Sequence, residues 1–99
     1  MGFAGPTYTE VTFLKDDKPT FSAETEQDMG CMMLDNAAVA QRAYDDLNES
    51  IAAGKTPAAA ADFNAVSLRG RTFDVLAKAP KLVISEEPRR NAGRGPKAP

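Results

Sequence analysis

Hydrophobic and polar residues alternate over residues 7–14, TYTEVTFL, and the alternation places Thr9, Val11 and Phe13 on one face. A period of two that is carried by β-branched and aromatic side chains is typical of a half-buried strand. We therefore predict a β-strand here. The KDDKP sequence that follows has the composition of a turn, and the TF pair at 20–21 is expected to return as a short second strand.

The spacing of apolar residues then changes from two to three and four. Ser22 is expected to cap a helix over 23–53, because its hydroxyl can accept a hydrogen bond from a free amide of the first turn. Gly54 is a suitable helix end. Gly30 and the DN pair at 35–36 have low helix propensity, so one continuous helix and two helices with a break both stay open. The apolar stripe of this segment comprises Met29, Met33, Ala37, Ala40, Tyr44, Leu47 and Ile51.

A further helix is predicted from Thr56 and Pro57, a cap residue followed by a favourable first helical residue, to Gly70. Residues 72–79, TFDVLAKA, fit either an alternating strand or a short helix. Residues 81–85, KLVIS, predict a short strand that is buried or pairs with the first strand.

Together these elements predict an α+β fold, in which a small sheet from the N- and C-terminal strands packs against two or three helices. The compact domain is expected to span residues 1–86, and residues 87–99 to form an extended basic tail rich in Pro and Gly. No apolar run is long enough for a bilayer span, and the N-terminus lacks the basic and apolar regions of a signal peptide. We therefore expect a cytoplasmic or virion protein without membrane contact.

The composition indicates a small core. The chain has 99 residues, 42% of them hydrophobic, but alanine supplies much of that content. Burial of apolar surface contributes ~25 cal/mol per Å², and an alanine side chain buries little of it. Oligomerisation or docking on a larger partner would add stability.

Charge is unevenly distributed along the chain. Residues 1–66 carry four basic and eleven acidic residues, a net charge of −7, whereas residues 67–99 carry eight basic and three acidic residues, a net charge of +5. Such polarity fits contact between copies of the chain or two different partners.

The sequence offers no catalytic, cofactor-binding or metal-binding motif. Histidine is absent, and the single cysteine, Cys31, excludes an internal disulfide and is expected to be a small buried apolar residue in a reducing compartment. The GKT sequence at 54–56 matches the end of a phosphate-binding loop, but Glu49 stands where that motif requires glycine. Asp45 and Asp46, together with Glu49, are interpreted as a solvated acidic face.

Two regions remain as candidates for partner binding. Met32 and its neighbours around Cys31 predict either a core or homotypic interface or an adaptable groove for a partner. The tail, residues 88–99, would lose roughly 18 kcal/mol of conformational free energy on ordering, at ~1.5 kcal/mol per residue, and its two alanines cannot offset that. We expect it to be fixed only by a neighbouring subunit. The predicted partner-binding residues are Met29, Met33, Tyr44, Arg89, Arg90, Arg94 and Lys97.

The leading hypothesis is therefore a non-enzymatic structural or interaction subunit of a larger assembly, of which a virion is one example. It would dock through an apolar helix face and a basic C-terminal arm, on other protein subunits or on copies of itself. The alternative is a small regulator, of inhibitor or antitoxin type, that binds nucleic acid through Arg69, Arg71 and the tail arginines, or that binds a nucleic-acid-binding protein through its acidic body.

Overall fold

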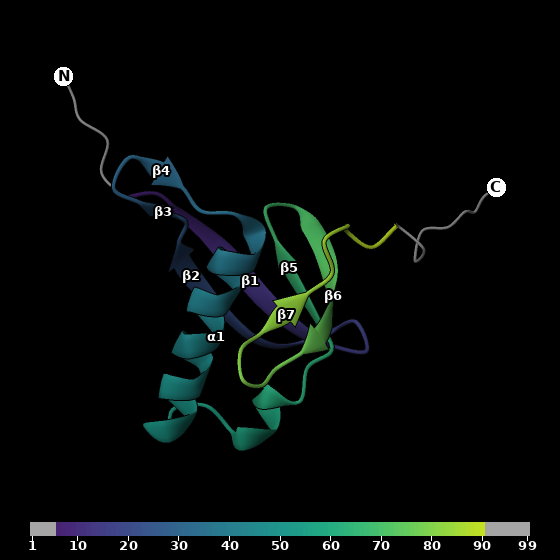
Figure 1. Cartoon of the computed structure of the whole chain (residues 1–99). Coiled ribbons are helices and arrows are strands. Elements are labelled where there is room, and N and C mark those ends of the chain that lie inside the picture. The colour runs from purple at the N-terminus through teal and green to yellow at the C-terminus, as the bar shows by residue number, and fades with distance from the viewer. Residues whose placement is uncertain (1–5, 91–99) are drawn as a thin grey trace.

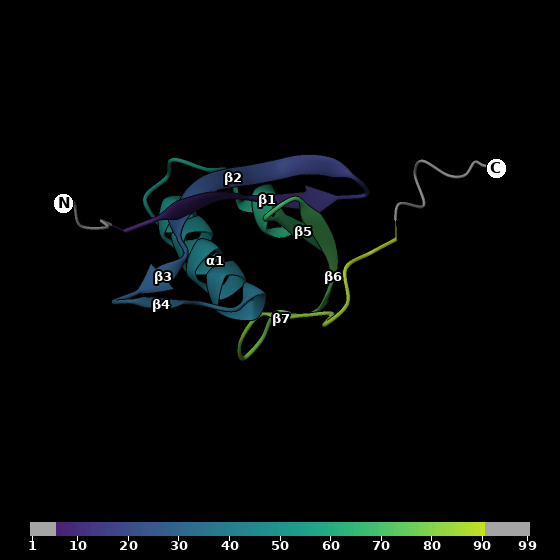
Figure 2. The same cartoon turned by 90° about the horizontal axis from the view of Figure 1, so that it is seen from above.

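The computed structural model of the protein describes residues 6–90. Its main element is a five-stranded antiparallel sheet with the strand order β2-β1-β5-β6-β7 (Figure 1). A separate two-stranded hairpin, β3–β4, projects at one end, and the helix α1 packs on one side of the sheet (Figure 2). The elements are β1 (Tyr8–Lys15), β2 (Lys18–Glu26), β3 (Asp28–Met29), β4 (Met32–Met33), α1 (Asn36–Ala52), the 3₁₀ turn η1 (Ala58–Ala61), β5 (Ala65–Leu68), β6 (Arg71–Ala77) and β7 (Val83–Ile84).

The predicted α+β class is confirmed, but residues 6–90 contain one α-helix and one 3₁₀ turn instead of two or three helices. The first strand is confirmed as β1, and the predicted TF strand is part of the much longer β2, which pairs with β1 along its whole length. The turn between them consists of Asp16 and Asp17, whose φ angles of 51° and 69° suit a two-residue hairpin turn. Short polar side chains tolerate this backbone region better than bulky ones.

The prediction that Ser22 caps a helix is wrong. Ser22 lies within β2, and its hydroxyl is 2.8 Å from the hydroxyl of Thr12 on β1. The helix begins only at Asn36, after the N-cap Asp35, whose carboxylate accepts a hydrogen bond from the amide of Ala38 at 2.9 Å. The acidic and amide residues that seemed to interrupt a helix are therefore its start, because side-chain oxygens at this position satisfy free amides. The predicted end before Gly54 is confirmed, since α1 ends at Ala52.

The second predicted helix, from Thr56 to Gly70, is wrong. Its alanine run forms only the four-residue turn η1, and the chain then enters β5, which pairs with β1 on one side and β6 on the other. Arg69 and Gly70 form the turn between β5 and β6, with φ angles of 53° and 79°. Pairing on both edges stabilises an extended backbone here, which the helix signals of the local sequence do not reveal.

The ambiguous segment 72–79 belongs mostly to a strand, β6. The short strand predicted at 81–85 exists as β7, and its Ile84 is buried, but it pairs with β6 and not with the first strand. The N- and C-terminal strands thus share one sheet without being neighbours in it.

The core lies between α1 and the sheet. Phe13 of β1 contacts Phe63, with ring centroids 4.4 Å apart, and both are almost completely buried. Four of the fourteen buried apolar residues of the described chain are alanines, as expected from the composition. α1 contributes Val39, Ala40, Ala43 and Leu47 to this core.

Candidate interaction surfaces

The methionine hairpin, which we define as residues 28–33, is the most apolar exposed feature of residues 6–90. Its side chains Met29, Met32 and Met33 are 59%, 70% and 62% exposed. The interpretation of Met29 and Met33 as members of a helical stripe or as core is therefore wrong. Gly30, with a φ of 64°, is one of two residues in the tight turn between β3 and β4. The hairpin projects at the edge of the body in both views (Figures 1 and 2).

Methionines lie on both faces of this hairpin. Met29 pairs with Met32, and the next pair along the ladder joins Asp28 to Met33. Because successive residues of a strand point to opposite faces, Met29 and Met32 share one face and Met33 lies on the other. Cys31, at the turn, is exposed, so its predicted burial is wrong. Unbranched thioether side chains that are exposed on two faces can adapt to a partner that contacts the hairpin from both sides.

Arg69 fixes the base of the methionine hairpin. From the β5–β6 turn its Nε donates to the side-chain oxygen of Gln27 at 2.8 Å, and one Nη donates to the carbonyl oxygen of Leu34 at 2.9 Å. The other Nη donates to the side chain of Asn36 at 2.9 Å. The amide of Leu34 in turn donates to the carbonyl oxygen of Gln27 at 2.9 Å. One guanidinium therefore joins both strands of the hairpin to the first residue of α1.

Tyr44, a predicted partner-binding residue, belongs to the interior instead. Its ring lies edge-on to Phe63 at 5.7 Å and to Phe13 at 6.5 Å, and it packs against the core while half-buried. The apolar face of α1, with Leu47 at its centre, is covered by the sheet of the same chain. This helix face is consequently not a docking surface in the described structure.

Arg89, predicted to need a neighbouring subunit, is bound to its own body. Its guanidinium donates to Asp74 on β6 at 2.6 and 3.1 Å and to Asp17 in the β1–β2 turn at 2.8 Å. Its amide donates to the carbonyl oxygen of Thr72. The hydrogen bond to Asp74 is the main cause that raises the pKa of Arg89 above its usual value. The compact body thus continues beyond residue 86. Arg90 is exposed, and Arg94 and Lys97 lie outside the described residues.

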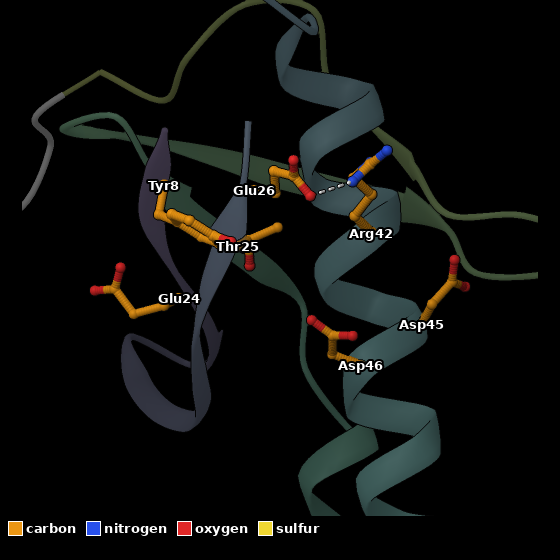
Figure 3. A pocket seen from close by; sticks show the side chains of 7 residues that line it. All are labelled: Tyr8, Glu24, Thr25, Glu26, Arg42, Asp45 and Asp46. Atoms are coloured by element: carbon orange, nitrogen blue, oxygen red, sulfur yellow. Dashed lines mark hydrogen bonds and ion pairs between the residues drawn. The ribbon is translucent and has the colours of Figure 1, made fainter. Parts of the chain in front are cut away.

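A polar depression of about 340 Å³ lies between the end of β2 and α1 (Figure 3). Arg42 from α1 and Glu26 from β2 form an ion pair across it at 3.5 Å. Burial, followed by the nearby carboxylates of Glu49 and Asp45, raises the pKa of Asp46 above its ordinary value, whereas Arg42 lowers it. The depression is lined by Tyr8, Glu24, Thr25, Glu26, Arg42, Asp45 and Asp46.

Across residues 6–90, no three His, Cys, Asp or Glu side chains are grouped so that they could hold a metal ion. The GKT sequence at 54–56 lies directly after the helix α1, and the next element is the short 3₁₀ turn η1. The hydroxyl of Thr56 lies 2.6 Å from that of Ser50. A phosphate-binding loop would require a strand before it and a long helix after it. Within residues 6–90, no helix is long and apolar enough to cross a membrane.

A second exposed apolar surface was missed by the sequence analysis. We define the β6–β7 patch as Leu76, Val83 and Lys81. Leu76 and Val83 are 66% and 41% exposed, and Val83 pairs with the residue that follows Leu76. The signal was a large apolar residue at an outward position of the alternating TFDVLAKA strand. Nearby Lys78 is turned inward instead, with its Nζ 4.0 Å from the ring centre of Phe63, and burial lowers its pKa.

Comparisons with known proteins add no family. No protein-family model, no curated protein and no solved structure matches the chain. Functional inference therefore depends on the surfaces described above.

Proposed function

We propose that the protein is a non-enzymatic interaction subunit of a larger assembly, which docks through its methionine hairpin. A single observation carries this proposal: each of the three methionines of one hairpin is 59–70% exposed. Exposed large apolar side chains that gather in one place are typical of protein–protein contact sites. The anchoring by Arg69 supports it, because a positioned hairpin loses less conformational entropy on docking than a mobile one.

The basic residues beyond the body, Arg90, Arg94 and Lys97, are proposed as a secondary, salt-sensitive contact. The exposed thiol of Cys31 supports a reducing setting, which fits a cytoplasmic assembly or a virion formed there. Nucleic-acid binding is supported less well, because Arg69 and Arg89 already donate to groups of their own chain.

The proposal is tested by affinity capture from cells that make the protein, with quantitative mass spectrometry. The wild type is compared with the triple variant Met29→Ser, Met32→Ser, Met33→Ser and with Asn48→Ser, an exposed change on α1 that serves as a matched control. We expect one set of associated proteins that is lost with the triple variant and kept with the control. An untagged copy of the chain is produced in the same cells, so that self-association also counts as a partner. Recovery of the same partners with the triple variant would contradict docking through the hairpin, and so would recovery of neither a stoichiometric foreign protein nor the untagged copy.

A further inference from the structure

The two exposed apolar surfaces differ in their electrostatic surroundings. The methionine hairpin lies within residues 24–35, ETEQDMGCMMLD, which contain four carboxylates and no lysine or arginine. Arg42 pairs with one of these carboxylates, Glu26, and Arg69 lies at the base of the hairpin, so the surroundings remain acidic through the other three. The β6–β7 patch lies within residues 71–90, which contain five basic and three acidic residues. Lys78 is turned inward and Arg89 is paired with Asp74, so the exposed basic residue of the patch itself is Lys81. One surface is therefore apolar and acidic, and the other is apolar and basic. Each has the chemistry that the other requires from a partner.

The two surfaces cannot satisfy each other within one molecule. In both views the hairpin lies at the left end of the body, whereas β6 lies at the right, beyond β1 and β5 in the sheet (Figures 1 and 2). The exposure of Met32 at 70% and of Leu76 at 66% agrees with this separation. A contact between them must join two copies of the chain.

We propose that the protein self-associates head to tail, with the methionine hairpin of one copy on the β6–β7 patch of the next. This inference rests on the proposed function and names its partner as a second copy of the chain. Met29 and Met32 of the hairpin would cover Leu76 and Val83, and Lys81 would face the carboxylates that flank the hairpin. Because the two surfaces differ, the contact is heterologous, and each copy keeps one free surface of each kind at the ends of a row.

Sedimentation velocity or light scattering across a concentration series tests the proposal. The wild type is compared with a hairpin variant, Met29→Ser with Met32→Ser, and with a patch variant, Leu76→Ser with Lys81→Glu. We expect wild-type mass to rise with concentration, and each methionine removed to weaken association at least about tenfold. Asn48→Ser is the matched control and should associate like the wild type. All four changed positions are exposed, and thermal unfolding of each variant checks the fold.

An equal mixture of the two variants gives the decisive result. The intact hairpin of the patch variant can still bind the intact patch of the hairpin variant, so the mixture should form a 1:1 dimer that does not grow further. A mixture that stays monomeric would overturn the proposal. So would a wild type that is monomeric at every concentration, or a patch variant that still associates, since the latter indicates contact between two hairpins. A monomeric wild type that nevertheless captures a foreign protein through its hairpin would overturn only this inference and leave the proposed function standing.

A second measurement uses the wild-type sequence and avoids substitution. Cys31 is the only cysteine and is exposed at the hairpin turn, so a nitroxide can be attached there. Spin-labelled copies with natural isotopes are mixed with ¹⁵N-labelled copies, so that any paramagnetic broadening is intermolecular. We expect the amide signals of Leu76 and Val83 to be broadened most. Broadening confined to other residues, or none at all, would overturn the proposed contact.

Discussion

Replacement of Arg69 by methionine tests whether one guanidinium holds the methionine hairpin in place. Arg69 makes three hydrogen bonds of 2.8–2.9 Å, to Gln27, Asn36 and Leu34, and a longer one of 3.5 Å to the carbonyl oxygen of Gln27. Methionine keeps a long apolar side chain and removes every donor. The expected effect is therefore local opening of the hairpin and not collapse of the core. The hairpin forms a separate two-stranded sheet, whereas core residues such as the fully buried Val66 belong to the five-stranded sheet.

The magnitude follows from the number and exposure of these bonds. A hydrogen bond to a charged group contributes about 1.5–3 kcal/mol when well shielded, but Arg69 is exposed and water replaces part of each bond. We therefore expect the free energy of opening the hairpin to fall by about 2 kcal/mol in total. Since each 1.4 kcal/mol is a factor of ten, amide exchange at Leu34 should become roughly 30-fold faster.

Native-state hydrogen exchange measures this directly, because the Leu34 amide donates across the base of the hairpin to Gln27 at 2.9 Å. Exchange at Val66 should change little and reports the core. Arg71→Met is the matched control, since Arg71 follows the same turn, is exposed and makes no side-chain hydrogen bond within residues 6–90. Unchanged exchange at Leu34 in the Arg69 variant, or equal acceleration in both variants, would refute the anchoring role.

Three further changes test the core, the C-terminal attachment and the acidic face. Leu47→Ala removes a fully buried side chain and should lower the free energy of unfolding by about 2–5 kcal/mol in a urea titration; a loss under about 1 kcal/mol would contradict the assigned core. Arg89→Met should lower the melting temperature by a few degrees at low salt and less at about 1 M salt, because salt screens the ion pairs that it removes; a salt-independent loss would count against an electrostatic role. Asp46 has a raised pKa, so the native state binds its proton more tightly than the unfolded state, and charged Asp46 reduces stability at neutral pH. Asp46→Asn should therefore raise the melting temperature slightly near neutral pH, and this gain should disappear as the pH falls through the raised pKa, whereas a gain that persists at lower pH would exclude this cause.

The parts of the fold that the sequence predicts are those in which local pattern and long-range pairing agree. Residues 7–14 alternate and lie on the sheet, and the structure buries Val11 and Phe13 while it leaves Glu10 exposed. The error at residues 22–35 arises because Ser22 followed by two glutamates is also a good helix start. Only the register with β1, set across the turn, shows that this segment is extended. Helical spacing of Met29 and Met33 with residues of α1 is coincidental, since Asp35 separates them from the helix.

The candidate surfaces were predictable to different extents. A cluster of methionines is visible in the sequence, but its exposure depends on the strand–turn–strand geometry around Gly30. The ion pairs of Arg89 join residues that are 15 and 72 positions apart, so composition alone could not show that this arginine is attached to its own body. The sequence of residues 72–79 fits both a strand and a helix. Only in a strand, which the structure shows, does the alternation place Leu76 on the outward face.

The small core makes the placement of the large apolar side chains informative. A chain that buries four alanines among fourteen core residues would gain stability from burying a methionine, by about 1.5–3 kcal/mol for each side chain. Three of its four methionines instead lie exposed on a hairpin whose base is fixed by Arg69. Selection for stability alone would favour serine or lysine at an exposed hairpin turn, since these residues would keep the turn soluble at no cost to the core. Contacts that the hairpin makes outside its own chain would account for exposed methionine at all three positions, whichever partner is bound.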